Sequence, residues 1–354
     1  MAKRGNTLRH RAAFCMEWVP RDNNGLMRLG VLDIGSNTVH LLLVDARPGA
    51  NPVPYASHKR PLSLVKYLDD EGNISDEGQH ELIEFILEAW EFAAKHKAKD
   101  LLAFCTSAIR ESTNGAAVLA RVQHETTVRL TELTGEEESA MTFFAVRRWL
   151  GWGAGTILNL DIGGGSFEIS QGENELPVLA HSVPLGAGRL TREWLAEDPP
   201  TAKSIKELRK HIKSTLKEPI AETKKLGVPN IVTGSSKTFR ALARITGAAP
   251  SSMGPYVRRE LHLSDLGLWS QRLSAMSSAD RLFLPGVSSA RAQQVLAGAL
   301  VAQSALEMFN VTSMQISPWA LREGLILRRL DQLVFDGPLD PPAHVAKLRN
   351  SDTK

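Results

Sequence analysis

The sequence predicts an α/β protein made of two related domains, and two observations carry this prediction. The segment Asp-Ile-Gly-Ser at residues 33–36 returns as Asp-Ile-Gly-Gly-Gly-Ser at residues 161–166, each time between two apolar runs. After the first copy, helix-like and strand-like segments alternate, and the second half then begins again with its own hairpin. A repeated strand, turn and strand indicates duplication, with a site between the two copies.

The first half opens with two strands at residues 29–34 and 39–44, because both runs are rich in β-branched and aliphatic residues around a short turn. A long helix begins at Ser75 or Asp76, since apolar residues recur at helical spacing after this point. The other elements predicted here are a strand at 53–57, a strand at 101–104, a helix at 116–125, a strand at 127–130 and a helix at 136–149.

The second half repeats the hairpin at residues 157–162 and 167–170, with glycines in the turn. A strand at 229–233 runs into the segment Gly-Ser-Ser-Lys-Thr at 234–238, which opens a helix at 239–245. The other elements predicted here are a strand within 175–182, helices near Leu190 and at 204–217, 264–276 and 290–309, a strand at 314–316 and a helix at 320–330.

Composition favours an ordinary soluble protein, with 354 residues of which 43% are hydrophobic and 23% charged. No run approaches the roughly 20 apolar residues that span a bilayer, and the start lacks the apolar core of a secretory signal. We therefore expect a cytoplasmic protein without a membrane partner. Cys15 and Cys105 provide neither a disulfide framework nor metal-ligand spacing.

The net charge of +3 comes from residues 1–26, where five basic residues face two acidic ones, 5 − 2 = +3. Met27 stands directly before the first strand, so we expect either that Met27 is the natural start or that residues 1–26 are a disordered extension. Residues 336–354 are expected to be a tail. Basic residues spread over such a segment are usually solvated, and no specific nucleic-acid partner is expected.

The two glycine turns suit an anion, because glycine permits positive φ and lets backbone N–H groups converge. The residues predicted to bind phosphate are Gly35, Ser36, Asn37, Thr38, Gly163, Gly164, Gly165 and Ser166. Asp33 and Asp161 would repel phosphate, which makes sense if a divalent cation or a water lies between them. Alternatively, the side chain of either aspartate would cap its own turn by a hydrogen bond to the backbone.

Four motifs, in this order, resemble the exopolyphosphatase/guanosine pentaphosphate phosphohydrolase (Ppx/GppA) family. They are residues 31–38, Thr-Ser-Ala-Ile-Arg at 106–110, Gly-Glu-Glu-Glu at 135–138 and residues 160–168. The resemblance implies two duplicated actin-like (ribonuclease H-like) domains with an interdomain cleft. It is nearest to the short two-domain type of actinobacteria, because no room remains for the additional helical domains of longer relatives.

The resemblance also implies the domain boundaries and the central roles. Domain I would comprise residues 27–134 plus about 317–335, and domain II residues 135–316. Glu138 aligns with the catalytic base of the family, whereas Glu136 and Glu137 are expected to complement the helix N-terminus. The acids that would hold Mg²⁺ are Asp33, Asp161 and Glu168, and oxygen-only ligands suit this ion.

Three basic residues are candidates for phosphate contacts. Arg110 follows a buried strand, where its guanidinium would grip phosphate oxygens or instead pair with Glu111 or another acid. Arg189 and Lys237 are candidates for the distal part of a phosphate chain. The serines of the Gly-Ser-Ser-Lys segment at 234–237 stand where many relatives are richer in glycine, which weakens the expectation of a nucleotide pocket.

The resemblance therefore predicts a Mg²⁺-dependent exopolyphosphatase that removes terminal phosphate from inorganic polyphosphate by attack of water. Hydrolysis of guanosine pentaphosphate (pppGpp) or of another nucleoside polyphosphate is the alternative, because all these substrates present a phosphate end. An actin-like ATPase would need a committed nucleotide pocket. A non-catalytic polyphosphate or alarmone sensor would not need Glu138, Asp161 and Glu168 together. A homodimer is left open.

Overall fold

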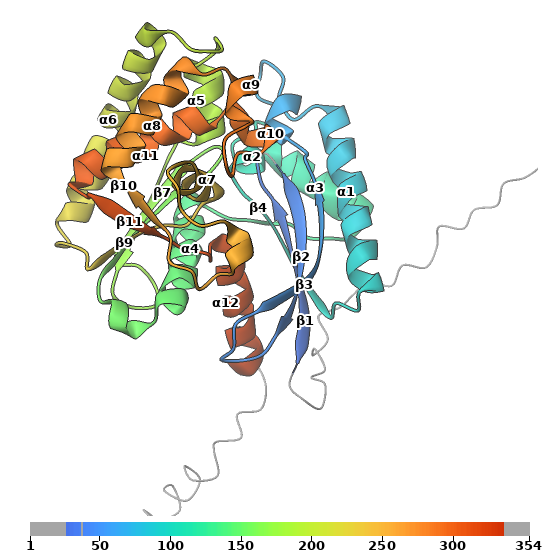
Figure 1. The fold of residues 1–354 in the computed structure, drawn as a ribbon. Helices are drawn as coiled ribbons and strands as arrows, with labels where there is room; N and C mark the ends of the chain where they lie inside the picture. The colour runs from blue at the N-terminus through green and yellow to red at the C-terminus, as the bar shows by residue number, and fades with distance from the viewer. Residues whose placement is uncertain (1–25, 37, 336–354) are drawn as a thin grey trace, which may run out of the picture.

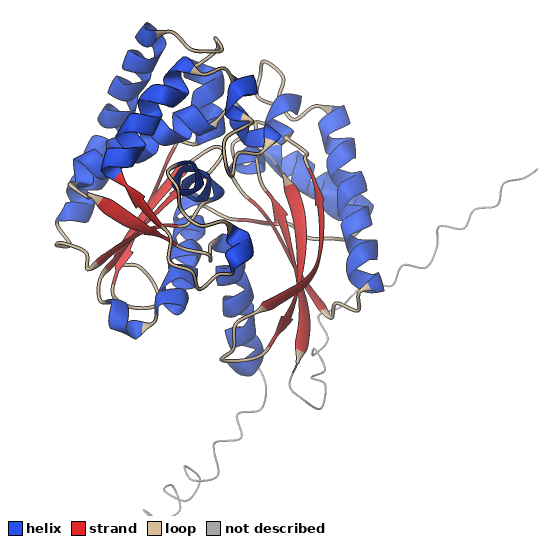
Figure 2. Cartoon of the chain, viewed as in Figure 1, coloured by secondary structure: helices blue, strands red, loops and turns tan. Residues whose placement is uncertain are grey.

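The computed structural model describes residues 26–36 and 38–335, which form two mixed β-sheets flanked by helices (Figure 1, Figure 2). The strand order is β3-β2-β1-β4-β5 in the first sheet and β10-β11-β9-β6-β7-β8 in the second. The predicted extension, apart from Leu26, and the predicted tail lie outside the described residues, and so does Asn37. Within the described ranges, no helix is both long enough and apolar enough to cross a bilayer.

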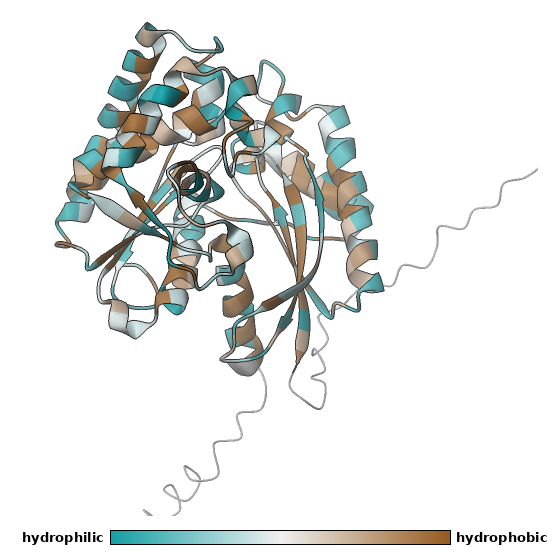
Figure 3. Ribbon diagram, viewed as in Figure 1, coloured by the Kyte–Doolittle hydropathy of each residue, from teal (hydrophilic) through white to brown (hydrophobic). Residues whose placement is uncertain are grey.

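The first sheet is built on β1, which pairs antiparallel with β2 and parallel with β4. Helices α1 and α3 pack against one face in a single apolar cluster, and α12 covers the other. The central strands and α12 are largely hydrophobic (Figure 3). The strands are β1 (Met27–Ile34), β2 (Val39–Ala46), β3 (Val53–Arg60), β4 (Asp100–Cys105) and β5 (Thr131–Glu132). The helices are η1 (Leu64–Tyr67), α1 (Asp76–Lys95), α2 (Ser107–Arg110), α3 (Gly115–Thr126) and α12 (Leu321–Phe335).

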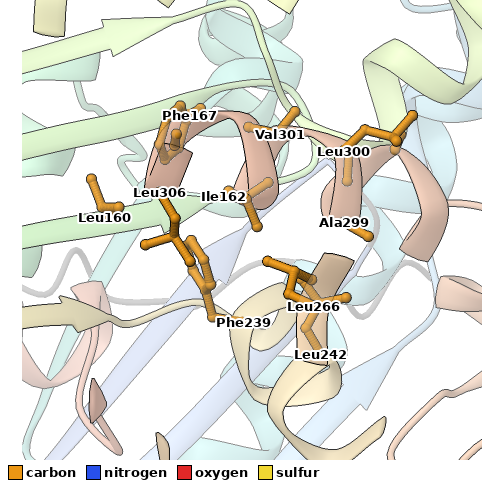
Figure 4. Packing of buried hydrophobic residues seen from close by; sticks show 14 of the residues in the cluster. Leu160, Ile162, Phe167, Phe239, Leu242, Leu266, Ala299, Leu300, Val301 and Leu306 are labelled. Carbon is orange, nitrogen blue, oxygen red and sulfur yellow. The ribbon is translucent and has the colours of Figure 1, made fainter. Parts of the chain in front are cut away.

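The second sheet has α4 on one face and the main core of the molecule on the other. Figure 4 shows side chains of β6, β7, α7, α8 and α11 meeting in this core. The strands are β6 (Ile157–Ile162), β7 (Phe167–Gly172), β8 (Leu179–Val183), β9 (Ile231–Gly234), β10 (Glu260–His262) and β11 (Ser313–Ile316). The helices are α4 (Gly135–Leu150), η2 (Trp152–Ala154), α5 (Ala187–Trp194), α6 (Ala202–Lys224), α7 (Lys237–Ile245), η3 (Ser251–Met253), α8 (Leu263–Ala275), α9 (Ser278–Arg281), α10 (Ser289–Ala292) and α11 (Val295–Phe309).

The two sheets share one topology, which confirms the predicted duplication. In each, the first strand of the hairpin pairs antiparallel with the second and parallel with a later strand, as β1 does with β2 and β4, and β6 with β7 and β9. The outer pairs agree as well, since β2·β3 and β7·β8 are antiparallel while β4·β5 and β11·β9 are parallel. Strand β10 is an addition at the edge of the second sheet.

Helices α4 and α12 lie together between the two sheets (Figure 1). A Cβ on Gly324 of α12 would stand 2.0 Å from the carbonyl oxygen of Met141 in α4, so the helices touch backbone to backbone there. Phe144 of α4 joins the apolar cluster of α12 and the first sheet, while Phe143 belongs to a cluster under the second sheet. The pairing joins the two halves, and the assignment of residues 317–335 to domain I, with boundaries at 134/135 and 316/317, stays a prediction.

Two sequence expectations differ from the structure. The strand predicted at 127–130 begins only at Thr131, because Thr127 takes a left-handed conformation with φ of 62° to end α3. The helix predicted at 290–309 divides into α10 and α11, separated at Gln293 and Gln294. In both cases the boundary of the element lies where the chain turns, and the spacing of apolar residues does not show where that happens.

Candidate active site

The turns of the two hairpins meet at the cleft between the sheets. Each has the same internal bond, from Gly35 N to Thr38 O at 3.1 Å and from Gly163 N to Ser166 O at 2.9 Å. Ser36 of the first turn shares a hydrogen bond with Ser107 of α2, with 2.9 Å between the two hydroxyl oxygens. A Cβ on Gly165 would stand 2.5 Å from the Ser107 hydroxyl and 3.6 Å from that of Ser36. The structure therefore brings both predicted turns to one place.

The second turn is held by the N-terminal end of α5. The N–H groups of Gly186, Ala187 and Arg189 donate to the carbonyl oxygens of Gly165, Gly163 and Gly164, at 3.2, 3.0 and 2.9 Å. Gly186 allows this approach, because a Cβ on it would stand 2.2 Å from the carbonyl carbon of Gly165. Three backbone hydrogen bonds to the start of α5 thus help to fix the position of the turn.

The two hairpins present different pairs of side chains. Asp161 and Glu168 are direct cross-strand partners in the β6·β7 register, which brings them together although seven positions separate them in the sequence. In the first hairpin, Asp33 stands opposite His40. Burial, followed by the nearby guanidinium of Arg322, lowers the pKa of His40 to about 3, so this imidazole is neutral. The duplicated topology therefore carries an acid pair in only one copy.

The three glutamates at the start of α4 occupy three environments. Glu137 forms a capping box with Thr134, whose hydroxyl accepts from Glu137 N at 3.1 Å, and Glu136 is exposed. Glu138 is mostly buried, and its Oε2 lies 3.5 Å from Arg110 with no hydrogen-bond partner. Burial raises the pKa of Glu138 to about 7 against the opposing effect of Arg110, and the charges of Asp161 and Asp33 raise it further.

The other three acids also have raised pKa values. Burial, then repulsion from Glu138 and Asp161, holds the pKa of Glu168 well above its ordinary value although Ser182 donates to its Oε1 at 2.9 Å. Burial raises the pKa of Asp161 to about 6, against a 2.6 Å hydrogen bond from Ser235. Burial likewise raises the pKa of Asp33, which Arg322 faces at 3.9 Å. Burial thus disfavours the ionised form of all four acids.

These acids do not form a ready-made metal cage. Across residues 26–36 and 38–335, no group of three or more His, Cys, Asp and Glu side chains stands at metal-binding spacing. The assignment of Asp33, Asp161 and Glu168 to a metal therefore stays a prediction. Their chemistry still fits Mg²⁺, which usually takes one or two carboxylates and completes its shell with water and substrate phosphate.

The predicted basic residues have specific partners. Arg110 donates to the carbonyl oxygen of Leu133 at 2.6 Å while facing Glu138, so the acid with which it pairs is Glu138 and not Glu111. Arg189 donates from Nε to Gly165 O at 2.9 Å, and its guanidinium pairs with Glu111 of the C-cap of α2. Arg189 therefore bridges the cleft beside the second turn.

A second group of cations lies near Asp33, and the sequence pointed only to Lys237. Although Lys237 keeps contact with solvent, burial by the surrounding protein and the charges of Arg322 and Arg291 lower its pKa to about 8. Arg240 of α7 donates to Ser235 O at 3.1 Å, and Arg322 of α12 contacts both His40 and Asp33. No sequence signal marked Arg240, Arg291 or Arg322, because helix packing brings them here from separate segments.

A cavity of about 510 Å³ extends from the two turns between the halves of the molecule. Ser36, Ser107, Gly164 and Gly165 line it beside the turns. The charged residues on its wall are Lys66, Glu111, Arg189, Arg192, Glu197, Asp198 and Arg281. The predicted interdomain cleft is therefore present, and it is large enough for a ligand that extends beyond one phosphate group.

Comparisons with known proteins agree with this architecture. The sequence model described as the Ppx/GppA phosphatase family matches residues 43–333. Exopolyphosphatase 1 of Mycobacterium tuberculosis is 51% identical over 305 residues, which cover 86% of this chain and 89% of that protein.

Two solved structures show the same fold at lower identity. An exopolyphosphatase from Cytophaga hutchinsonii has a TM-score of 0.78 at 23% identity, over 86% of this chain and 98% of that one. The Ppx/GppA family member of Aquifex aeolicus has a TM-score of 0.73 at 24% identity, over 87% of this chain and 98% of that one.

Proposed function

Because the chain belongs to the Ppx/GppA phosphatase family, we propose that it is an exopolyphosphatase, which releases the terminal phosphate of inorganic polyphosphate. Its 51% identity to an exopolyphosphatase extends over 86% of the chain and includes both halves of the cleft. The reaction is hydrolysis of a phosphoanhydride bond, and the two turns with the neighbouring acids and Arg110 would supply the groups for it.

The observation that carries the proposal is the state of Glu138. Glu138 Oε2 is buried and has the Arg110 guanidinium beside it at 3.5 Å, so it can accept a further hydrogen bond from a water or a ligand. A pKa of about 7 suits a group that accepts a proton from water near neutral pH. Glu138 also lies at the start of α4, among the carboxylates at the ends of β1 and β6.

The glycine turns and Arg110 would bind the terminal phosphate. Backbone N–H groups at such turns, with the hydroxyls of Ser36 and Ser166, are suited to phosphate oxygens. Arg110 reaches the same region and would balance charge that develops as the bond breaks. Lys237 would meet more distal phosphates, and Arg189 would do so after exchanging Glu111 for phosphate.

Asp33, Asp161 and Glu168 would hold Mg²⁺. Burial is the main cause of the raised pKa values of these acids, and a bound divalent cation would favour their ionised form. When bound, Mg²⁺ would neutralise charge on the phosphate oxygens.

The chemical step follows from these positions. Glu138 accepts a proton from water as the water oxygen bonds to the terminal phosphorus. The bond between that phosphorus and the bridging oxygen breaks, and the bridging oxygen leaves with the shortened chain. The products are orthophosphate and a polyphosphate one unit shorter. No covalent enzyme intermediate is needed, because water itself is the nucleophile.

The test measures phosphate release with Mg²⁺ from short polyphosphate, long polyphosphate, pppGpp and ATP. Glu138→Gln keeps the shape of the side chain but cannot accept the proton, so we expect turnover of polyphosphate to fall by roughly 10²–10⁴-fold. Glu136→Gln is the matched control, because Glu136 belongs to the same helix turn but is exposed, and it should retain full turnover.

Two results would overturn the assignment. Near-normal turnover by Glu138→Gln would remove Glu138 as the base. A kcat/KM for pppGpp above that for every polyphosphate would replace the substrate, and preference for ATP would make the chain an actin-like ATPase.

A further inference from the structure

A chain of buried polar side chains runs beneath the cleft, on the face of the second sheet that α4 covers. Asn159 lies two residues before Asp161 on β6, and the two share this face. Thr233 of the neighbouring strand β9 is the direct partner of Asn159 in the parallel register. Asn159 is 1% exposed, while Thr233 and Ser235 are fully buried. Such polar groups are costly inside a sheet unless each is hydrogen-bonded.

These side chains connect to Asp161 in three links. Thr233 Oγ1 lies 2.9 Å from Asn159 Oδ1, Asn159 Nδ2 lies 3.2 Å from Ser235 Oγ, and Ser235 Oγ lies 2.6 Å from Asp161 Oδ2. The link to the carboxylate is the shortest of the three. The chain ends on one of the acids that the proposed function assigns to Mg²⁺.

The ionised carboxylate sets the direction of every link. A carboxylate can only accept, so Ser235 must donate its one proton to Asp161. The Ser235 oxygen is then free to accept from the Asn159 amide nitrogen. This turns the amide oxygen of Asn159 toward Thr233, which donates to it. Only one orientation of the Asn159 amide satisfies all three links.

Each hydroxyl also has a backbone carbonyl oxygen nearby as an alternative acceptor, and the network favours the side-chain acceptor. Ser235 Oγ also lies 3.5 Å from the carbonyl oxygen of Leu160, and Thr233 Oγ1 lies 3.4 Å from that of Leu158. Both distances are longer than the side-chain links by at least 0.5 Å, being 3.5 against 2.6 and 3.4 against 2.9. Without the Asn159 amide, the Ser235 hydroxyl loses its donor and can rotate toward Leu160.

We propose that Asn159 and Thr233 are positioning residues that, through Ser235, hold the Asp161 carboxylate in one orientation for a divalent cation. This rests on the proposed function, in which Asp161 serves Mg²⁺. The relay is suited to the task because it is neutral. A lysine or arginine in its place would also hold the carboxylate, but its charge would oppose the cation.

The experiment compares Ser235→Ala, Asn159→Leu and Thr233→Val with the unaltered chain. Two quantities are measured: the Mg²⁺ concentration for half-maximal phosphate release, and the rise in melting temperature that Mg²⁺ produces without substrate. Loss of a partner that orients a metal-binding carboxylate typically costs 10–100-fold. We therefore expect the half-maximal concentration to rise about ten-fold or more for Ser235→Ala, less for Asn159→Leu and least for Thr233→Val, with the Mg²⁺-induced thermal shift falling in the same order.

Two controls separate orientation from simple loss of stability. Thr223→Val removes an equally buried hydroxyl, which donates only to Pro219 O within α6, and should leave the Mg²⁺ response unchanged. Thr233→Ser keeps the hydroxyl and should restore the response that Thr233→Val loses. The proposal fails if Asn159→Leu and Thr233→Val respond to Mg²⁺ as Thr223→Val does, or if Thr233→Ser does not restore the response.

Asp161→Asn distinguishes this failure from failure of the proposed function. If Asp161→Asn keeps the normal Mg²⁺ response, Asp161 does not serve the cation, and both proposals lose their metal assignment. If Asp161→Asn loses the response while the Asn159 and Thr233 variants keep it, the metal assignment stands and the relay alone is wrong.

Discussion

Three adjacent glutamates have different roles because the protein surrounds each of them differently. Glu137 completes a capping box, Glu136 faces solvent and Glu138 is enclosed among other acids. The sequence predicted a helix-terminal role for the first two from their place at the helix start. It identified Glu138 only through family resemblance, because neither spacing nor composition reports which side of a helix faces a cleft.

The raised pKa of Glu138 predicts an acidic limit to activity. Below its pKa of about 7 the carboxyl is protonated and cannot take a proton from water, so kcat/KM should fall by about ten-fold per pH unit there. Because a nearby cation favours the ionised carboxylate, the acidic limb of the pH profile of kcat/KM should move to lower pH as the Mg²⁺ concentration rises. Initial rates from pH 5 to 9 at two Mg²⁺ concentrations measure this. A flat profile down to pH 5 at low Mg²⁺ would contradict it.

The site residues outside the motifs could not be predicted from the sequence, because helix packing brings them to the site. Arg322 and Arg240 approach Asp33 and Ser235 only because α12 and α7 pack where they do. Arg189 was expected to contact the distal part of a phosphate chain, but its guanidinium is occupied by Gly165 O and Glu111. The sequence does not show which acid will pair with Arg189, because Glu111 becomes its neighbour only in the folded protein.

At the scale of elements, the second turn depends on its contact with α5. Gly186→Ala would place a methyl group 2.2 Å from the Gly165 carbonyl carbon and 2.4 Å from Ser166 N, and neither backbone atom can give way. We expect a loss of roughly 1–3 kcal/mol in the free energy of unfolding. Displacement of the turn should also cost at least about ten-fold in kcat/KM.

Gly153→Ala is the control for this substitution, since a Cβ there meets nothing within 4 Å. Urea unfolding and phosphate release are measured for both variants. Normal activity of Gly186→Ala, with only stability reduced, would show that the position of the turn tolerates displacement and would refute the proposed cradle.

Most of the elements that the sequence predicted bury a continuous apolar face, although the predicted strand β3 has no fully buried residue. Both hairpins and the long helix α1 have such faces, and hydrophobic spacing reports them directly. Strands β5 and β10 have two and three residues, so their existence depends on a neighbouring strand and not on their own pattern. The duplication was predictable because the two turns keep nearly the same residues, whereas the assignment of α12 to the first sheet came from family resemblance.

At the scale of the whole molecule, the contacts between the two halves include one made by backbone packing and one made by an ion pair. The α4·α12 pair joins them at the base through backbone packing at Gly324. Across the cleft, Glu111 and Arg189 form an ion pair between partly exposed side chains. An exposed pair of this kind contributes little to stability. Its position on the cavity wall makes it more relevant to the ligand than to folding.

This arrangement predicts that Glu111→Gln lowers the KM for polyphosphate. Glu111 occupies the guanidinium of Arg189 and adds negative charge to the cavity that we propose to receive polyphosphate, so its neutralisation should lower KM by roughly two- to five-fold at low salt, with little change in kcat. High salt should remove the difference, because it screens exposed charges. Glu125→Gln is the matched control, since Glu125 also pairs with an arginine, Arg121, but lies outside the cavity lining. The KM of each variant is measured by steady-state kinetics at low and high salt. An unchanged or raised KM for Glu111→Gln would mean that the ion pair shapes the cleft and does not compete with the substrate.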